Sequence, residues 1–129
     1  MRVAAIQMNS GPDVSANLDL AGQLLDEAAA AECVLAVLPE NFALMPERGK
    51  DKASYAEKLG DGPIQTFLSE TAARNGMWII GGSMPLVSPE IAAERVYGAC
   101  PVYDAEGKGA VSYTHLRAHE TILPISYSV

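Results

Sequence analysis

The sequence lacks the features that mark membrane-spanning and disulfide-rich proteins. Its 129 residues include only two cysteines, Cys33 and Cys100, which form neither a CxxC pair nor a metal-binding spacing. We therefore expect a reduced, cytoplasmic protein. No apolar run approaches the roughly 20 residues that cross a bilayer, and no signal peptide is recognisable, so we expect no membrane partner.

Basic residues are also scarce. Nine Lys and Arg stand against 16 Asp and Glu, which gives a net charge of −7, and no basic cluster interrupts this balance. Binding to a nucleic-acid backbone needs clustered cations, so the sequence excludes that class of partner. With 49% hydrophobic and 19% charged residues, the chain should fold as one domain or part of one.

Apolar runs that alternate with helical patterns predict an α/β fold. We expect strands at Arg2–Met8, Cys33–Leu38, Met77–Ile80 and Arg95–Tyr103, with residues 104–109 turning into an antiparallel hairpin partner. Cys33–Leu38 and Met77–Ile80 are continuously apolar, which is typical of strands buried on both faces. This order predicts a mixed sheet with right-handed helical crossovers.

Two helices are predicted between these strands. Asp13 is placed to cap the first helix, whose inward residues recur at steps of four and three: Val14, Leu18, Ala21, Leu25 and Ala28. Asp61-Gly62-Pro63 starts the second helix and Gly76 ends it. Its inward face is Ile64, Phe67, Leu68, Thr71 and Ala72. Glu32 follows the first helix where a left-handed residue is common and a non-glycine costs about 1 kcal/mol.

The remaining segments are predicted as loops. Residues 41–60 mix proline, glycine and charges, which indicates a long loop with a helical turn. Pro85 and Pro89 indicate a second loop. Pro101 falls inside a predicted strand, where it removes a backbone donor, so the strand should be at an edge or bulged there.

Glu40 is the residue best placed for chemistry. Ligands of open α/β sheets bind beyond the carboxyl ends of the strands, and Glu40 follows the Cys33–Leu38 run directly after Pro39. A carboxylate at the rim of an apolar strand is expected to be partly desolvated, as suits a general base. The spacing alone leaves open that Glu40 is a solvated loop residue.

An ordered set of short motifs resembles the nitrilase, or carbon–nitrogen hydrolase, superfamily. The similarity is greatest to its bacterial amidases, of the Nit2-like omega-amidase or deaminated-glutathione amidase type, and covers residues 1–110. The segments that carry it are 3–8 (VAAIQM), 38–42 (LPENF), 61–63 (DGP), 80–85 (IGGSMP), 95–97 (RVY) and 102–107 (VYDAEG).

The resemblance implies an αββα sandwich, of which this chain would hold a part, and a Glu-Lys-Cys triad. It assigns the general base to Glu40. In such a triad the base deprotonates the cysteine thiol, the thiolate attacks a small linear amide, and a thioester forms as ammonia leaves. The lysine stabilises the oxyanion, and water then releases the acid. The resemblance implies no metal or organic cofactor, and relatives that form homo-oligomers.

The other two members of the triad are not found in the sequence. The family's lysine falls in a motif that corresponds here to residues 113–117 (YTHLR), which contain none, and Lys108 is several residues too early. Neither Cys33 nor Cys100 matches the nucleophile motif, and both fit small buried hydrophobes better. The nucleophile should lie beyond Val129. We therefore predict that this chain is a truncated enzyme without activity of its own.

The family pattern stops abruptly after residue 110. Residues 111–121 (VSYTHLRAHET) resemble one reading frame through a sequencing adapter, which predicts that residues 111–129 are an artefactual tail. His115 and His119 have the i, i+4 spacing that could hold a metal on a helix, but no third ligand is evident. The alternative to the enzyme is a non-catalytic α/β binding or interaction module that retains the fold. A flavodoxin-like binder is disfavoured because no phosphate loop is present.

Overall fold

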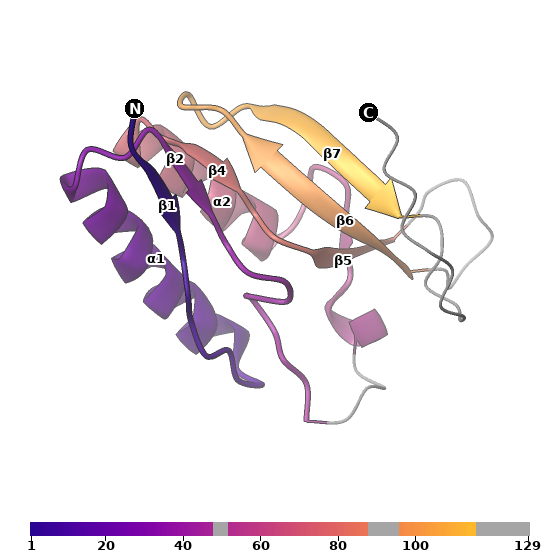
Figure 1. The fold of residues 1–129 in the computed structure, drawn as a ribbon. Helices are drawn as coiled ribbons and strands as arrows, with labels where there is room; N and C mark the ends of the chain where they lie inside the picture. The colour runs from indigo at the N-terminus through magenta and orange to yellow at the C-terminus, as the bar shows by residue number, and fades with distance from the viewer. Residues whose placement is uncertain (48–51, 88–95, 116–129) are drawn as a thin grey trace, which may run out of the picture.

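The structure is a computed structural model that describes residues 1–47, 52–87 and 96–115 (Figure 1). Two α-helices, a short 3-10 helix and seven strands alternate along the chain. The helices are α1 (Val14–Ala30), the 3-10 helix η1 (Lys52–Tyr55) and α2 (Pro63–Asn75). The strands are β1 (Val3–Ala5), β2 (Leu35–Val37), β3 (Glu57–Lys58), β4 (Trp78–Ile80), β5 (Met84–Val87), β6 (Val96–Tyr103) and β7 (Gly109–His115).

The seven strands form one mixed sheet in the order β1-β2-β4-β6-β5-β3, with β7 on the free side of β6. Strands β1, β2 and β4 are parallel, and β6 is antiparallel to β4, β5 and β7. One edge of β6 therefore pairs with two strands, β4 near its end and β5 near its start, while β7 follows the other edge. The mixed α/β sheet and the antiparallel hairpin at residues 96–115 confirm the fold class predicted from the sequence.

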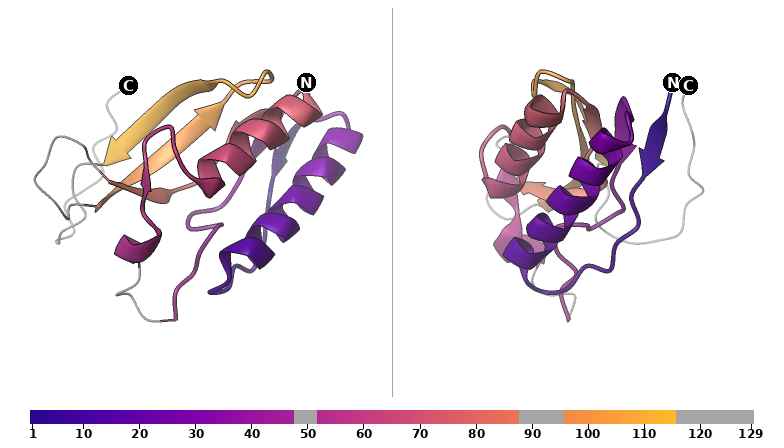
Figure 2. Two further views of the ribbon diagram at one scale, coloured as in Figure 1. Left: turned by 180° about the vertical axis from the view of Figure 1, so that it is seen from behind. Right: turned by 90° about the vertical axis from the view of Figure 1, so that its left-hand side faces the viewer.

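Both α-helices lie on the same face of the sheet (Figure 2). The Asp13 carboxylate caps α1 by accepting a 3.1 Å hydrogen bond from the Ala16 amide, as expected. The predicted inward faces are confirmed, since Ala21, Leu25 and Leu68 are fully buried. Burying aliphatic side chains in this way supplies about 25 cal/mol per Å² and holds the helices to the sheet.

Helix α2 begins at a corner built around a buried glutamate. Glu57 is 7% exposed, and its carboxylate accepts hydrogen bonds from the amides of Ile64 at 2.7 Å and Gln65 at 3.1 Å. Gly62 precedes Pro63 with a φ of 148°, and a β-carbon on it would overlap the Glu57 side chain. A negative charge at a helix N-terminus is stabilised by the unpaired amides and by the helix dipole. This corner explains why the Asp-Gly-Pro start contains a glycine.

The opposite face of the sheet is apolar but open. Val3 and Trp78 both pair with Leu35, one on each side, and they are 58% and 44% exposed. Val37 is 38% exposed. Burial on both faces, expected for the runs that contain β2 and β4, is therefore wrong for the chain as described. The prediction failed because periodicity reports an apolar strand and not whether a second layer covers it. No described element lies on this face.

Strand β5 occupies a segment that was expected to be a loop. Met84 and Leu86 are buried while Pro85 and Val87 are half-buried, which is the alternation of a strand. Pro85 is tolerated because β3 pairs only with Leu86 and Val87, so its missing amide leaves no bond of that ladder unmade. The sequence-based prediction gave more weight to Pro85 and Pro89 than to the short alternation of buried and half-buried positions.

Pro101 is accommodated where the partner strand changes. Its carbonyl accepts a 2.8 Å hydrogen bond from the Gly81 amide, so its nitrogen faces the connection between β4 and β5. A register shift follows at once between Val102 and Tyr103. The expected irregularity is present, one residue further along the strand.

Strand β7 runs across residue 110, where the family pattern was expected to end. It pairs with β6 as far as His115, so this histidine ends a strand and does not lie on a helix with His119, which is outside the described residues. The division at residue 110 stays a prediction. Residues 116–129 of the predicted tail lie outside the described part of the chain.

Candidate functional site

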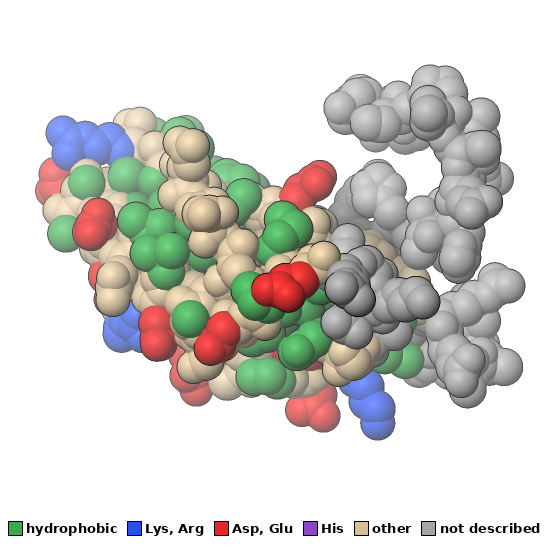
Figure 3. Space-filling view, turned by 90° about the horizontal axis from the view of Figure 1, so that it is seen from below, with side chains coloured by type: hydrophobic (Ala, Val, Ile, Leu, Met, Phe, Trp, Pro, Cys, Tyr) green, Lys and Arg blue, Asp and Glu red, His purple; other side chains and the backbone are tan. Residues whose placement is uncertain are grey.

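Three chain segments meet at one end of the sheet. Because β1, β2 and β4 are parallel and in register, the segments that follow them start side by side. Glu40 comes from the middle segment, at the carboxyl end of β2, as the sequence predicted. The molecule viewed from this end shows hydrophobic and acidic side chains side by side (Figure 3). This end of the molecule therefore carries both apolar and acidic side chains.

The Glu40 side chain is exposed between two buried neighbours. Leu38 is 2% exposed and Phe42 is fully buried, while Glu40 points into solvent. No described residue gives its carboxylate a hydrogen bond or an ion pair. The expected desolvation is absent from the described chain, because no described element covers this end of the sheet. The carboxylate is thus not engaged by any residue that the structure describes.

The backbone immediately before and after Glu40 is fixed against β4 and the turn that follows β4. The Leu38 amide donates to the Ile80 carbonyl at 2.9 Å, and the Asn41 amide donates to the Ser83 carbonyl at 3.1 Å. Gly82 has a φ of 63°, and a β-carbon there would overlap the Pro39 carbonyl oxygen. Glycine is therefore required for the two loops to pass this closely.

The backbone on the C-terminal side of Glu40 is fixed against the loop after β1. The Ser10 hydroxyl donates to the Phe42 carbonyl at 2.7 Å, and the Met45 amide donates to the Gly11 carbonyl at 3.0 Å. The Asn17 amide nitrogen donates to the Ala43 carbonyl at 2.9 Å. The segment that carries Glu40 is thus held on both sides although its side chain is free.

Asn17 and Ser10 were missed by the sequence analysis. Asn17 lies four residues before Ala21, on the inward face of α1, where a polar residue is unusual. A buried polar side chain needs hydrogen-bond partners, so its position was a usable signal. Ser10 lies in a loop whose approach to Phe42 depends on the tertiary fold, and no local pattern indicates it.

The other residues considered for the triad do not gather at Glu40. Cys33 precedes β2 and Glu40 follows it, so they lie at opposite ends of that strand. Tyr103 pairs with Ile79, so the turn that contains Lys108 lies at the amino end of β4, also away from Glu40. Cys100 is a free, half-buried thiol in β6, and burial raises its pKa, which disfavours a thiolate.

A small hollow lies beside the Glu40 segment. Its lining includes Asn41, Tyr55 and Ser83, and its volume of about 10 Å³ leaves room for a water molecule and not for an amide substrate. The described residues thus place a carboxylate at the site but do not enclose a substrate pocket around it.

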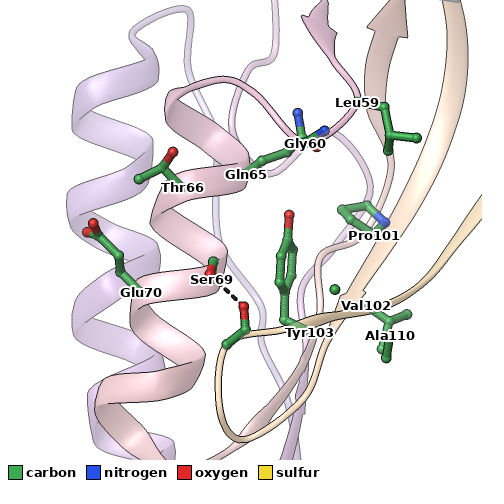
Figure 4. Close-up of a pocket in the computed structure, with 12 residues that line it drawn as sticks. Leu59, Gly60, Gln65, Thr66, Ser69, Glu70, Pro101, Val102, Tyr103 and Ala110 are labelled. Atoms are coloured by element: carbon green, nitrogen blue, oxygen red, sulfur yellow. Dashed lines mark hydrogen bonds between the residues drawn. The ribbon is translucent and has the colours of Figure 1, made fainter.

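A larger cavity of about 600 Å³ lies elsewhere, between α2 and the β6–β7 hairpin (Figure 4). The Ser69 hydroxyl donates a hydrogen bond to the Gly107 carbonyl at 2.6 Å. The Gln65 side-chain amide donates to the Glu57 carboxylate and to the Lys58 carbonyl. Burial and, secondarily, the charge on Glu57 raise the pKa of Tyr103, whose phenol stays neutral. Ser69 and Gln65 are thus engaged in holding the fold, so this cavity is a weaker candidate than the end that carries Glu40.

The described residues form neither a metal-binding cluster nor a membrane-spanning helix. No three His, Cys, Asp or Glu side chains among the described residues are grouped to hold a metal ion. No helix there is long and apolar enough to cross a membrane.

Comparisons with known proteins agree with this arrangement. The family model described as carbon-nitrogen hydrolase matches residues 2–125. The omega-amidase NIT2 of Danio rerio is 35% identical over 92% of this chain and 40% of its own length. The deaminated glutathione amidase of Yersinia enterocolitica is 32% identical over 86% of this chain and 38% of its own length. The chain therefore spans about two fifths of these curated relatives.

Solved structures give the same fold. Nit3 of Saccharomyces cerevisiae, a member of the nitrilase superfamily, superimposes with a TM-score of 0.73 at 25% identity, covering 84% of this chain and 41% of Nit3. The NitFhit protein of C. elegans gives a TM-score of 0.77 at 20% identity, covering 98% of this chain and 30% of NitFhit. Fold and sequence thus agree that the chain belongs to the carbon–nitrogen hydrolase family.

Proposed function

We propose that this chain is the general-base portion of an amidase that hydrolyses a small linear amide to a carboxylic acid and ammonia. The observation that carries the proposal is the Glu40 segment, whose backbone is held on both sides at the carboxyl end of the parallel strands while its carboxylate stays unengaged. The names of the relatives at 35% and 32% identity support the amide as substrate class. A location in a reducing compartment such as the cytoplasm fits the two free cysteines.

The mechanism we propose uses Glu40 twice. Its carboxylate first takes the proton of a cysteine thiol, and the thiolate attacks the amide carbon to give a tetrahedral oxyanion that a lysine ammonium stabilises. Collapse expels ammonia, which receives the proton, and leaves a thioester. Glu40 then takes a proton from water, which attacks the thioester and releases the acid and the thiol. The lysine and the cysteine would come from a part of the parent protein outside these 129 residues.

The open sheet face supports the same view of a parent protein. We propose that a second layer of the sandwich packs on the face that exposes Val3, Val37 and Trp78. Exposed apolar surface of this kind normally marks an interface. Such a layer would exclude water from the end of the sheet and supply the desolvation that Glu40 lacks in the described chain. Homo-oligomerisation of the parent enzyme remains part of the proposal.

The test begins with the genomic locus downstream of this sequence. A reading frame that continues with a lysine and a cysteine in family context should, when expressed, release ammonia from small linear amides. Glu40→Gln should lower kcat by at least about 1000-fold, because it removes the base and keeps the size of the side chain. Glu47→Gln, an exposed glutamate in the same loop, is the matched control and should change kcat by less than about twofold.

Three results would contradict the proposal. Full activity of Glu40→Gln would remove Glu40 from the mechanism. A genuine stop after Val129, with a stable chain that has no amidase activity, would favour the non-catalytic binding or interaction module. The 129-residue chain alone should release no ammonia, and activity from it would show that the missing triad members are not needed.

A further inference from the structure

We propose that Asn17, on helix α1, is a positioning residue for Glu40. Its side-chain amide joins the loop after β1 to the loop after β2, and the second of these loops carries Glu40. The inference rests on the proposed function, because it assigns Asn17 a role in a reaction for which Glu40 is the base. It does not require Asn17 to contact the substrate.

The hydrogen bonds of Asn17 satisfy its amide almost completely. The side chain is 4% exposed. Its nitrogen donates to the Gly11 carbonyl at 2.8 Å and to the Ala43 carbonyl at 2.9 Å, and its oxygen accepts from the Gly11 amide at 2.9 Å. A primary amide has two N–H donors and one carbonyl oxygen, so both donors and the acceptor are in use. Because all three partners are backbone groups, the side chain fixes the paths of two loops.

This bridge continues to Glu40 through a short run of fixed residues. Ala43 follows Phe42, whose ring is fully buried and lies 6.5 Å from the Phe67 ring, centroid to centroid. The Leu44 amide closes a turn on the Asn41 carbonyl at 3.1 Å, and Asn41 itself has a φ of 54°. Asparagine adopts the left-handed backbone more readily than other non-glycine residues, so residue 41 suits this turn. The hydrogen bond from Asn17 to the Ala43 carbonyl holds the same turn, three residues after Glu40.

Other side chains cannot replace the amide. Alanine would leave the Ala43 carbonyl and the Gly11 amide without their buried partner, and the Gly11 carbonyl with the Met45 amide alone. Aspartate has nearly the same shape, but as a carboxylate it has no donor and would place a negative oxygen beside two carbonyl oxygens. The bridge therefore depends on the chemistry of asparagine and not only on its volume.

The first test measures catalysis by the extended reading frame that continues from this chain. Asn17→Ala and Asn17→Asp should each lower kcat by about 100-fold with KM changed by less than about threefold, because a small displacement of a base slows the reaction far more than it weakens binding. Leu25→Ala is the control, since Leu25 is fully buried on the same helix two turns further on. It should destabilise the protein as much or more, yet keep kcat within about threefold below the melting temperature.

The second test measures amide hydrogen exchange in the 129-residue chain and needs no activity. In Asn17→Ala, exchange of the Asn41 and Met45 amides should rise at least about tenfold, while the Leu38 amide, bonded to the Ile80 carbonyl, should keep its protection. Asn41 and Met45 are informative because neither amide is bonded to Asn17 itself. Leu25→Ala should raise exchange at all three amides by a similar factor.

The outcomes separate this inference from the proposed function. If Asn17→Ala lowers kcat no more than Leu25→Ala does, or if Asn41 and Met45 keep their protection, Asn17 does not position Glu40. If the extended wild-type protein has no amidase activity, the proposed function is overturned and the positioning role with it. The exchange result then still decides whether Asn17 holds the loop.

Discussion

Two glutamates in this molecule are held in opposite ways. Glu57 is buried at the start of α2, and its carboxylate accepts three hydrogen bonds, from the amides of Ile64 and Gln65 and from the Gln65 side chain. Glu40 is exposed at the end of β2 and its carboxylate accepts none from the described residues. For Glu57 the side chain is fixed, whereas for Glu40 the backbone is fixed and the side chain is free.

This difference indicates which carboxylate is available for chemistry. The hydrogen bonds to Glu57 stabilise α2 and occupy its carboxylate oxygens, so this carboxylate has a structural role. Glu40 contributes no such bond, so its substitution should cost little stability and much activity. Substitutions that disturb each region in turn test the comparison.

The largest effect on stability is expected from Gly82→Ala, in the Glu40 region. The added β-carbon would overlap the Pro39 carbonyl oxygen at a backbone position with positive φ, and neither backbone segment can rotate away. We expect a loss of at least about 3 kcal/mol in the free energy of unfolding, measured with urea. Gly62→Ala meets the Glu57 side chain and not backbone, so the overlap can be relieved by moving that side chain out of its hydrogen bonds, and the loss should be smaller. A smaller loss for Gly82→Ala than for Gly62→Ala would contradict this order.

The next largest effect separates the two glutamates directly. Glu57→Ala leaves the Ile64 and Gln65 amides without their buried acceptor and should lower the free energy of unfolding by about 2–3 kcal/mol. Glu40→Ala removes an unbonded, exposed side chain and should change it by less than about 0.5 kcal/mol. Urea unfolding of the two variants side by side measures the difference, and equal losses would break the comparison.

The smallest effect concerns a third carboxylate, which is paired but exposed. Asp26 accepts hydrogen bonds from Arg74 and Asn75, both at 2.9 Å, and the Arg74 bond is the main reason why its pKa falls below the ordinary 3.8. A carboxylate with a lowered pKa in the folded state stabilises the fold above its unfolded pKa, and the contribution disappears as the pH falls through the folded pKa. Both side chains of the pair are more than half exposed, so the gain should stay below about 0.5 kcal/mol.

Comparing the wild type with Asp26→Asn measures this contribution. The wild type should be slightly more stable at neutral pH, and the difference should disappear in acid, as the pH falls through the lowered pKa that Asp26 has in the folded state. A difference that persists in acid would have another cause than the ion pair.

The local features of the fold were predictable because they depend on neighbouring residues. Asp13 caps α1, and Gly76 ends α2 in the left-handed conformation with a φ of 56°. Glu32 stands where a glycine cap is common, and it takes the left-handed conformation, with a φ of 61°. Each of these positions is set by the end of one helix, so the sequence of that helix contains the information.

The features that failed depend on contacts across the sheet. The apolar run that contains β2 predicts a strand equally well whether one face or both are covered, so the exposure of Val37 was not predictable. Strand β5 has only four residues, and it is a strand because it pairs with β6. The position of Glu40 was predicted from its strand, but its exposure and the anchoring by Asn17 depend on loops that meet only in three dimensions.

The close passage of Gly82 and Pro39 has a consequence for engineering this scaffold. The path of the backbone that carries Glu40 depends there on the absence of a side chain at residue 82, so randomising this residue in a mutational library would yield mostly unstable members. Met45 and Tyr55, which are 47% and 41% exposed, meet no such restriction. A library built on this scaffold should therefore diversify those two positions and keep the glycine constant.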